Sequence, residues 1–141
     1  MISVAIFIAT NGFAQMTETK KLATGKGGWE IEMNIKNGTD TSTYFYYSFQ
    51  NMEYSHIIDR GSIFFSKQKD LIAFADALKV LAGKESGARI QLKVDEYSLR
   101  LSDVSNYVYI EDEKGKYTYF TKKTAIKMAD EFIANAKLLR E

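Results

Sequence analysis

The chain contains a single histidine, His56, and histidine is the side chain best suited to acid–base chemistry near neutral pH. Asp59 follows three residues later, so a carboxylate could orient the imidazole as a general base. Nucleophilic catalysis would also need an activated serine and an oxyanion donor, and the sequence has no G-x-S-x-G pattern. We therefore expect His56 to be an ordinary strand residue and the protein not to be an enzyme. An enzyme centred on His56 is the alternative.

Metal, thiolate and phosphate chemistry lack the residues that they need. Cysteine is absent, which removes disulfides, thiolate nucleophiles and cysteine metal sites together. The acidic cluster Glu111-Asp112-Glu113 lies at an expected hairpin tip and lacks the spacing of a calcium-binding loop. The stretch 25–28 (GKGG) lacks the G-x-x-x-x-G-K-[ST] pattern of a phosphate-binding loop. We expect no catalytic residue, no metal and no cofactor.

Tyrosine is the residue type that stands out, with nine copies among 141 residues. On strands whose apolar residues face inward, alternation places a set of tyrosines on the outer side, with two cations nearby. The candidate ligand-binding residues are Tyr44, Tyr46, Lys93, Arg100, Tyr107, Tyr109, Tyr117 and Tyr119. Exposed aromatic groups mark binding surfaces, whereas cross-strand tyrosine pairs can also serve only to stabilise a sheet. Both interpretations stay open.

An internal repeat organises the elements that must hold these residues. The similar segments 64–67 (FFSK) and 119–122 (YFTK) each introduce an amphipathic run, and Ser66 and Thr121 are the expected N-caps. Each run predicts a helix with one apolar face, formed by Leu71, Phe74, Ala75, Leu78 and Leu81 in the first and by Ala125, Met128, Ala129, Phe132, Ala136 and Leu139 in the second.

Four strands are expected before each helix. Their ranges are 29–36, 43–50, 53–58 and 62–65 in the first half and 88–95, 97–101, 105–112 and 116–120 in the second. The predicted fold class is therefore α+β: a duplicated ββββα unit, with antiparallel sheet and two amphipathic helices packed on one face.

Two glycine turns set the expected register. Glu113-Lys114-Gly115 and Asp59-Arg60-Gly61 both match three-residue hairpin loops with glycine in the left-handed position. His56 and Phe64 then face outward. The inward positions are Trp29, Ile31, Met33, Ile35, Phe45, Tyr47, Phe49, Ile57, Ile63, Phe65, Ile90, Leu92, Val94, Leu99, Leu101, Val108, Ile110, Thr118 and Phe120.

The first residues resemble an export signal. Residues 2–9 (ISVAIFIA) form a largely apolar run, and Gly12 and Ala14 occupy the −3 and −1 positions of a cleavage site. We expect residues 1–14 to be a signal peptide, 15–28 a flexible lead-in, and 29–141 one domain of two repeats, 29–83 and 88–141. No cation precedes the apolar run, so a buried first strand is the alternative. The expected location is periplasmic or secreted, without a transmembrane anchor.

The repeated ββββα order is similar in topology to the Whirly and PUR-type single-stranded nucleic-acid-binding folds. That resemblance implies sheets that present aromatic and basic residues to unstacked bases. The formal charge of +1 departs from the basic surface that such binding needs. We therefore expect a non-enzymatic exported module that contacts a protein, peptide or cell-envelope component through its tyrosine-rich face. Single-stranded nucleic-acid binding is the alternative function, and self-association through a sheet edge is left open.

Overall fold

The computed structural model describes residues 17–25, 28–36, 40–54, 56–83 and 87–141, so the expected signal peptide lies outside the described residues. Two runs of four strands each end in a helix, which confirms the predicted α+β fold with a duplicated ββββα unit. The elements are β1 (Thr17–Thr24), β2 (Trp29–Lys36), β3 (Asp40–Gln50), β4 (Arg60–Phe65), α1 (Gln68–Ala82), β5 (Arg89–Val94), β6 (Tyr97–Val104), β7 (Tyr107–Glu111), β8 (Tyr117–Thr121), α2 (Lys122–Asn135) and a closing 3₁₀ turn (Ala136–Leu138).

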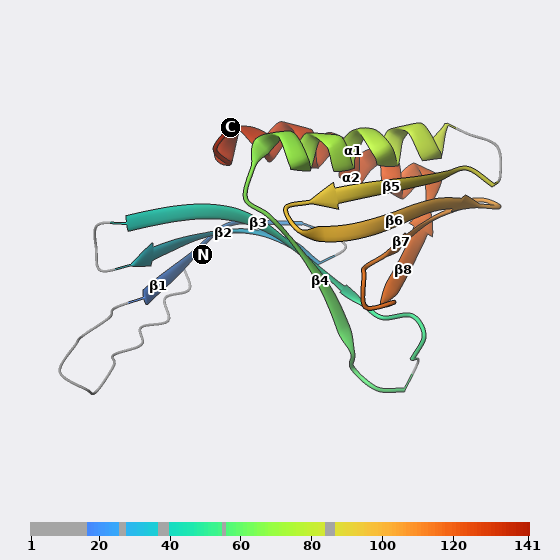
Figure 1. Cartoon of the computed structure of the whole chain (residues 1–141), viewed down its shortest axis with the longest axis horizontal. Coiled ribbons are helices and arrows are strands. Elements are labelled where there is room, and N and C mark those ends of the chain that lie inside the picture. Colours follow the sequence, from blue (N-terminus) through green and yellow to red (C-terminus); the bar gives the residue numbers. More distant parts are fainter. Residues whose placement is uncertain (1–16, 26–27, 37–39, 55, 84–86) are drawn as a thin grey trace.

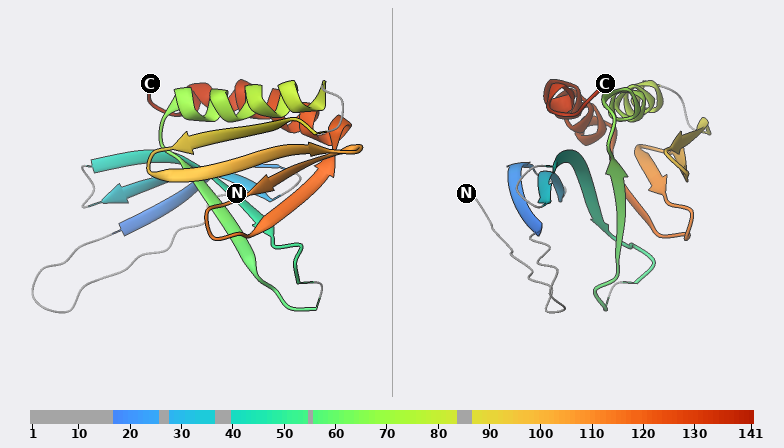
Figure 2. Two further views of the ribbon diagram at one scale, coloured as in Figure 1. Left: turned by 45° about the vertical axis from the view of Figure 1, so that its right-hand side comes forward. Right: turned by 60° about the vertical axis from the view of Figure 1, so that its left-hand side comes forward.

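Each run of four strands forms its own antiparallel meander. Sheet 1 has the order β1-β2-β3-β4 and sheet 2 the order β5-β6-β7-β8. Figure 1 shows α1 and α2 side by side along one side of the two sheets. An ion pair joins the helices, with 2.6 Å between Lys79 Nζ and Asp130 Oδ1. Each sheet thus has one face toward the helices and one face away from them (Figure 2).

The hydrophobic core is shared because each helix reaches the sheet of the other unit. α1 follows sheet 1 in the chain but contacts β5, β6 and β7 of sheet 2. Phe132 of α2 packs on Trp29 and Phe45 of sheet 1, with ring centroids 5.9 and 4.9 Å apart. Phe74 of α1 lies 5.9 Å from Phe132 and closes the cluster. One core therefore serves both units.

Strand alternation follows the prediction at most positions. The buried inward residues are Trp29, Ile31, Phe45, Tyr47, Phe49, Ile63, Phe65, Val94, Leu99, Leu101, Val108, Ile110 and Thr118. Met33, Ile90, Leu92 and Phe120 are half-buried. The side chain of Ile35 lies outside the described residues.

A strand replaces most of the expected flexible lead-in. β1 pairs with β2 in register Ala23↔Ile31, with an irregularity between Lys21 and Ala23. Lys21 bonds Glu30 across the pair at 2.9 Å. The lysines that made this stretch look like a linker are typical of an edge strand, where charge and bulges discourage pairing with other chains. The first unit therefore begins at β1, and its four strands are not the four that we predicted.

The predicted strand 53–58 and the predicted turn at Asp59-Arg60-Gly61 are both wrong. Residues 51–54 and 56–59 belong to no helix or strand, and Ile57, expected inside, is exposed. Arg60 and Gly61 already belong to β4, opposite Gln50 and Phe49. Gly61 does not provide a turn. The ring of Phe49 occupies the space where a Cβ at position 61 would lie.

The corresponding turn of the second unit matches its prediction. Asp112 N–H donates to the carbonyl of Lys116 at 2.9 Å, and Gly115 has a φ of +83°, which glycine adopts without strain. Thr121 caps α2 as expected by accepting from Thr124 N–H at 3.2 Å. Ser66 does not cap α1. Its hydroxyl instead donates to Asp95 at 3.3 Å, in the turn between β5 and β6.

Candidate functional site

Four of the predicted tyrosines form a continuous row of rings on sheet 2. Tyr119 lies between Tyr107 and Tyr109, with ring centroids 5.4 and 5.0 Å away. Tyr117 extends the row, 6.2 Å from Tyr109. Tyr107 is 40% exposed and Tyr119 38% exposed, while Tyr109 and Tyr117 are half-buried. We call these four residues the tyrosine ladder.

The ladder forms because the register of β7 and β8 places all four tyrosines on one face, with one directly opposed pair. Tyr109 lies directly opposite Tyr119, and the intervening residues Val108 and Ile110 face the core. Rings on directly opposite residues of antiparallel strands are in contact range. Both helices lie on the other face of the sheet (Figure 2). The ladder is therefore an aromatic strip on the outer face.

The two predicted cations share this face but differ in their surroundings. Arg100 lies in the same cross-strand row as Tyr117 and is ion-paired with Glu111 between them. Lys93 is exposed beside Ser98, one row further from the ladder. The outer face thus combines aromatic rings with one paired and one exposed cation at its margin.

The other two predicted tyrosines belong to a separate cluster on sheet 1. Tyr44 and Tyr46 both contact Phe64, with centroids 5.5 and 4.8 Å away. The Tyr44 hydroxyl donates to Glu32 at 2.5 Å. Tyr44 and Tyr46 lie on β3 of sheet 1, whereas the ladder lies on β7 and β8 of sheet 2. The six tyrosines are therefore two surfaces and not the single surface that alternation suggested.

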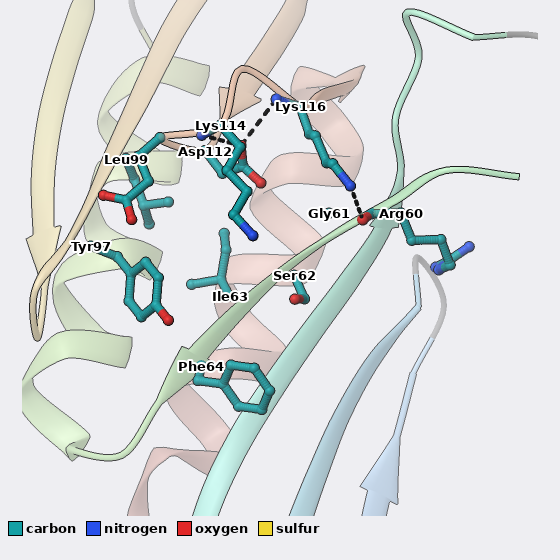
Figure 3. A pocket seen from close by; sticks show the side chains of 11 residues that line it. Arg60, Gly61, Ser62, Ile63, Phe64, Tyr97, Leu99, Asp112, Lys114 and Lys116 are labelled. Atoms are coloured by element: carbon teal, nitrogen blue, oxygen red, sulfur yellow. Dashed lines mark hydrogen bonds between the residues drawn. The ribbon is translucent and has the colours of Figure 1, made fainter.

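A pocket that the sequence did not indicate lies where the two units meet. Its volume is about 100 Å³. One wall is β4, and the opposite wall combines the start of β6 with the turn between β7 and β8 (Figure 3). The pocket is lined by both apolar and charged residues: Arg60, Gly61, Ser62, Ile63, Phe64, Tyr97, Leu99, Asp112, Glu113, Lys114 and Lys116. No local sequence pattern could have indicated this pocket, because its walls are brought together only by the tertiary fold. We call it the seam pocket.

A polar cluster holds the two units together beside this pocket. Asn51 is buried; its amide donates to Asp59 at 2.9 Å, and its Oδ1 accepts from the N–H of Tyr117 at 3.3 Å. Lys116 Nζ reaches back to Asp59 at 2.9 Å and to the carbonyl of Arg60 at 3.0 Å. Hydrogen bonds from Asn51 and then Lys116 hold the pKa of the Asp59 carboxyl below its usual value. We call Asn51, Asp59, Lys116 and Tyr117 the seam clamp.

Asp59, the carboxylate that could have oriented His56, belongs to the seam clamp. Asp59 bonds Asn51 and Lys116, and among the described residues no hydrogen bond joins it to His56. His56 lies exposed in the 51–59 loop, not on a strand as predicted. The arrangement offers no oriented general base at this position.

The three acidic residues at the turn between β7 and β8, Glu111, Asp112 and Glu113, each contact different partners. Asp112 accepts from the N–H groups of Lys114 and Lys116 at 2.9 and 3.0 Å, so it shapes its own turn. Glu111 pairs with Arg100, and Glu113 accepts from the N–H of Ser98 at 3.4 Å. Within the described part of the chain, no three acidic or histidine side chains converge on a common point.

Comparison with protein-family models, curated proteins and solved structures found no match. In the described residues no helix has the length and apolar character that crossing a membrane would require. The site is therefore interpreted from its own geometry.

Proposed function

We propose that this protein is a non-enzymatic binding module that contacts a protein or peptide of the cell envelope through the tyrosine ladder. The observation that carries the proposal is the unbroken row of four rings on a sheet face that neither helix covers. Tyrosine supplies a large rigid contact area at low conformational cost, and its hydroxyl keeps the surface compatible with water.

The ladder has the shape of a strip, which suits an extended ligand. Rings that follow one another across two strands can each take one apolar or planar group of a chain laid along them. Lys93 adds an exposed positive charge at the margin, while Arg100 is already engaged by Glu111. We expect recognition to come mainly from aromatic contact and only secondarily from charge.

Export is the second part of the proposal. It rests on the apolar run 2–9 followed by small residues at positions 12 and 14. Intact mass of the protein from separate cell fractions of the native host tests it. We expect a mature chain that begins at Gln15 in the periplasm or medium, and a full-length chain in the cytoplasm would contradict export.

The binding test uses matched tyrosine variants. Tyr107→Ala with Tyr119→Ala removes the two most exposed rings of the ladder, whereas Tyr54→Ala removes an equally exposed ring from the 51–59 loop. We expect the double variant to lose envelope proteins that the parent and Tyr54→Ala retain in a pull-down from an envelope extract. Equal capture by all three, with unfolding curves unchanged, would remove the ladder as the binding surface.

Single-stranded nucleic acid is the second candidate, because stacked rings beside cations also suit unpaired bases. Fluorescence anisotropy with a labelled mixed-sequence oligonucleotide distinguishes the two candidates. Binding that weakens steeply with added salt and is lost in the ladder variant would favour nucleic acid. We expect no binding at low ionic strength, in line with the formal charge of +1.

A further inference from the structure

The seam pocket exposes backbone groups of β4. Among the described strands, β4 pairs with β3 alone, so its other edge has no sheet partner in this part of the chain. Asn51 N–H donates to the carbonyl of Asp59 at 2.7 Å, so these two residues form a hydrogen-bonded pair. This pair shows which residues of β4 bond β3 and which do not. In antiparallel pairing, hydrogen-bonded and non-hydrogen-bonded pairs alternate. Arg60, Ser62 and Phe64 therefore point their N–H and C=O groups away from β3.

A second contact agrees with the direction of the Arg60 carbonyl. Lys116 Nζ donates to the carbonyl of Arg60 at 3.0 Å from the side opposite β3. Further along β4, the backbone groups of Ser62 and Phe64 have no hydrogen-bond partner among the described residues. Ser62 and Phe64 both line the seam pocket, so one wall of the pocket lies along this strand edge.

A contact bounds this edge of β4 on each side of Ser62 and Phe64. Lys116 occupies the carbonyl of Arg60 at one end, and Ser66 bonds Asp95 at the other. A strand advances by about 3.3 Å per residue, so only a few residues of an added chain fit between the two contacts. A chain end fits such a slot, whereas a strand that runs past it does not.

The remaining walls indicate which end of a chain is bound. Ile63, Leu99 and the ring of Tyr97 form the apolar part of the pocket. The whole pocket has a volume of about 100 Å³, far below the roughly 300–1,000 Å³ of a site for a whole small molecule. In Figure 3 the Lys114 side chain extends over this space, with its amine toward Ile63. No acidic partner of that amine occurs among the described residues, and Glu113 is occupied by Ser98 N–H. A positive charge beside this short strand edge suits a carboxylate.

We propose that the seam pocket captures the carboxyl terminus of an extended peptide. The peptide pairs its backbone with Ser62 and Phe64, places a small aliphatic last side chain against Ile63 and Leu99, and sets its terminal carboxylate toward Lys114. Strand addition supplies affinity through main-chain hydrogen bonds, and the carboxylate contact restricts binding to chain ends. This site is distinct from the tyrosine ladder, so either proposal can fail alone.

The probes are acetylated hexapeptides of alternating threonine and valine that end in alanine, valine or leucine. Each is made with a free carboxylate, as the amide, and with alternate backbone nitrogens methylated. Amide NMR signals of the labelled full chain report binding. We expect the free acids to shift the signals of Ser62 and Phe64 and to bind at least tenfold more tightly than the amides, while the methylated peptides do not bind.

A matched pair of variants tests the protein side. Ser62→Pro removes only an N–H that points away from β3, which an edge strand tolerates, whereas Ser62→Ala keeps that N–H. We expect binding to survive in Ser62→Ala and to be lost in Ser62→Pro. If Ser62→Pro does not fold, the methylated peptides make the same test from the ligand side.

Lys114→Gln tests the proposed contact with the terminal carboxylate of the peptide, and Lys69→Gln on α1 is the control. Lys114→Gln should weaken binding of the free-acid peptides to the level of the amides. Lys69→Gln should change the affinity for neither kind of peptide. Equal binding of acids and amides to the parent chain, or no shift at Ser62 and Phe64 up to millimolar peptide, would overturn the proposal.

Discussion

The two ββββα units share their order of elements but connect their third and fourth strands differently. In the second unit a short turn at residues 112–116 joins β7 to β8, and Asp112 bonds the backbone of that same turn. In the first unit the connection between β3 and β4 is the longer loop 51–59, whose ends bond Lys116 and Tyr117 of the other unit. The first unit thus uses its connection to hold the second.

The N-termini of the two helices differ in the same way: one makes local contacts and the other contacts between units. Ser66 and Thr121 occupy matching places in the FFSK and YFTK segments, but Thr121 caps its own helix and Ser66 bonds Asp95 of the other unit. The lysines that follow also diverge. Lys122 pairs with the fully buried Asp103 at 3.1 Å, whereas Lys67 is bridged through its backbone to Arg140. Similar sequence therefore serves local structure in the second unit and contacts between units in the first.

The largest expected effect comes from the lysine pair. Lys122→Met leaves the Asp103 carboxylate buried without its cation, and breaking such a pair costs about 3–5 kcal/mol. Lys67→Met removes no ion pair among the described residues and should stay within about 0.5 kcal/mol. Urea unfolding of both variants measures the difference. Equal stability loss would show that the two lysines are equivalent after all.

The seam clamp should matter next. Asn51→Ala removes the acceptor of Tyr117 N–H and the donor to Asp59, and leaves buried polar groups unsatisfied at a cost of about 1–3 kcal/mol. Gln50→Ala is the matched control, because its amide bonds only carbonyls of its own loop, those of Asn51 and Ile57. We expect Gln50→Ala to cost much less by urea unfolding. A loss in Gln50→Ala as large as that in Asn51→Ala would place the stabilisation within the loop and not between the units.

The sequence predicted the second unit better than the first because the second unit uses local rules. Strand alternation, the Gly115 turn and the Thr121 cap each depend on residues close in the chain, and each was confirmed. Gly61 misled the prediction because glycine serves both turns and close packing, and only the tertiary fold places Phe49 against it. β1 was missed because its lysines protect an edge that the sequence alone does not show.

In the candidate site, too, local features were predicted and tertiary contacts were not. Alternation predicted which tyrosines face outward, but it could not show that Tyr44 and Tyr46 pack on Phe64, apart from the ladder. The seam pocket was not predicted at all, because its walls come from two units joined by long-range contacts.

The two helix caps give a smaller contrast. Thr121→Ala should cost about 1 kcal/mol, the usual value for a lost N-cap hydrogen bond. Ser66→Ala loses only an exposed contact to Asp95 and should cost at most about 0.5 kcal/mol. Thermal unfolding of the two variants measures the contrast. A larger loss in Ser66→Ala would mean that the contact between units outweighs the cap.

The pH dependence of the clamp is the last and smallest effect, because Asp59 is partly exposed to solvent. The pKa of Asp59 is lowered in the folded state by Asn51 and Lys116 from an ordinary value of 3.8. A carboxyl with a depressed folded pKa stabilises the fold above its unfolded pKa, and this contribution is lost as the pH falls through the folded pKa. The stability advantage of the parent over Asp59→Asn should therefore be constant from neutral pH to about pH 5 and shrink at lower pH. Lys116→Met removes one of the two causes of the lowered pKa. In chains that carry Lys116→Met, we therefore expect the stability difference between chains without and with Asp59→Asn to decrease less between about pH 5 and pH 2. Urea unfolding measures that difference. A parent advantage that grows as the pH falls would show that Asp59 is protonated more readily in the folded chain, contrary to the clamp geometry.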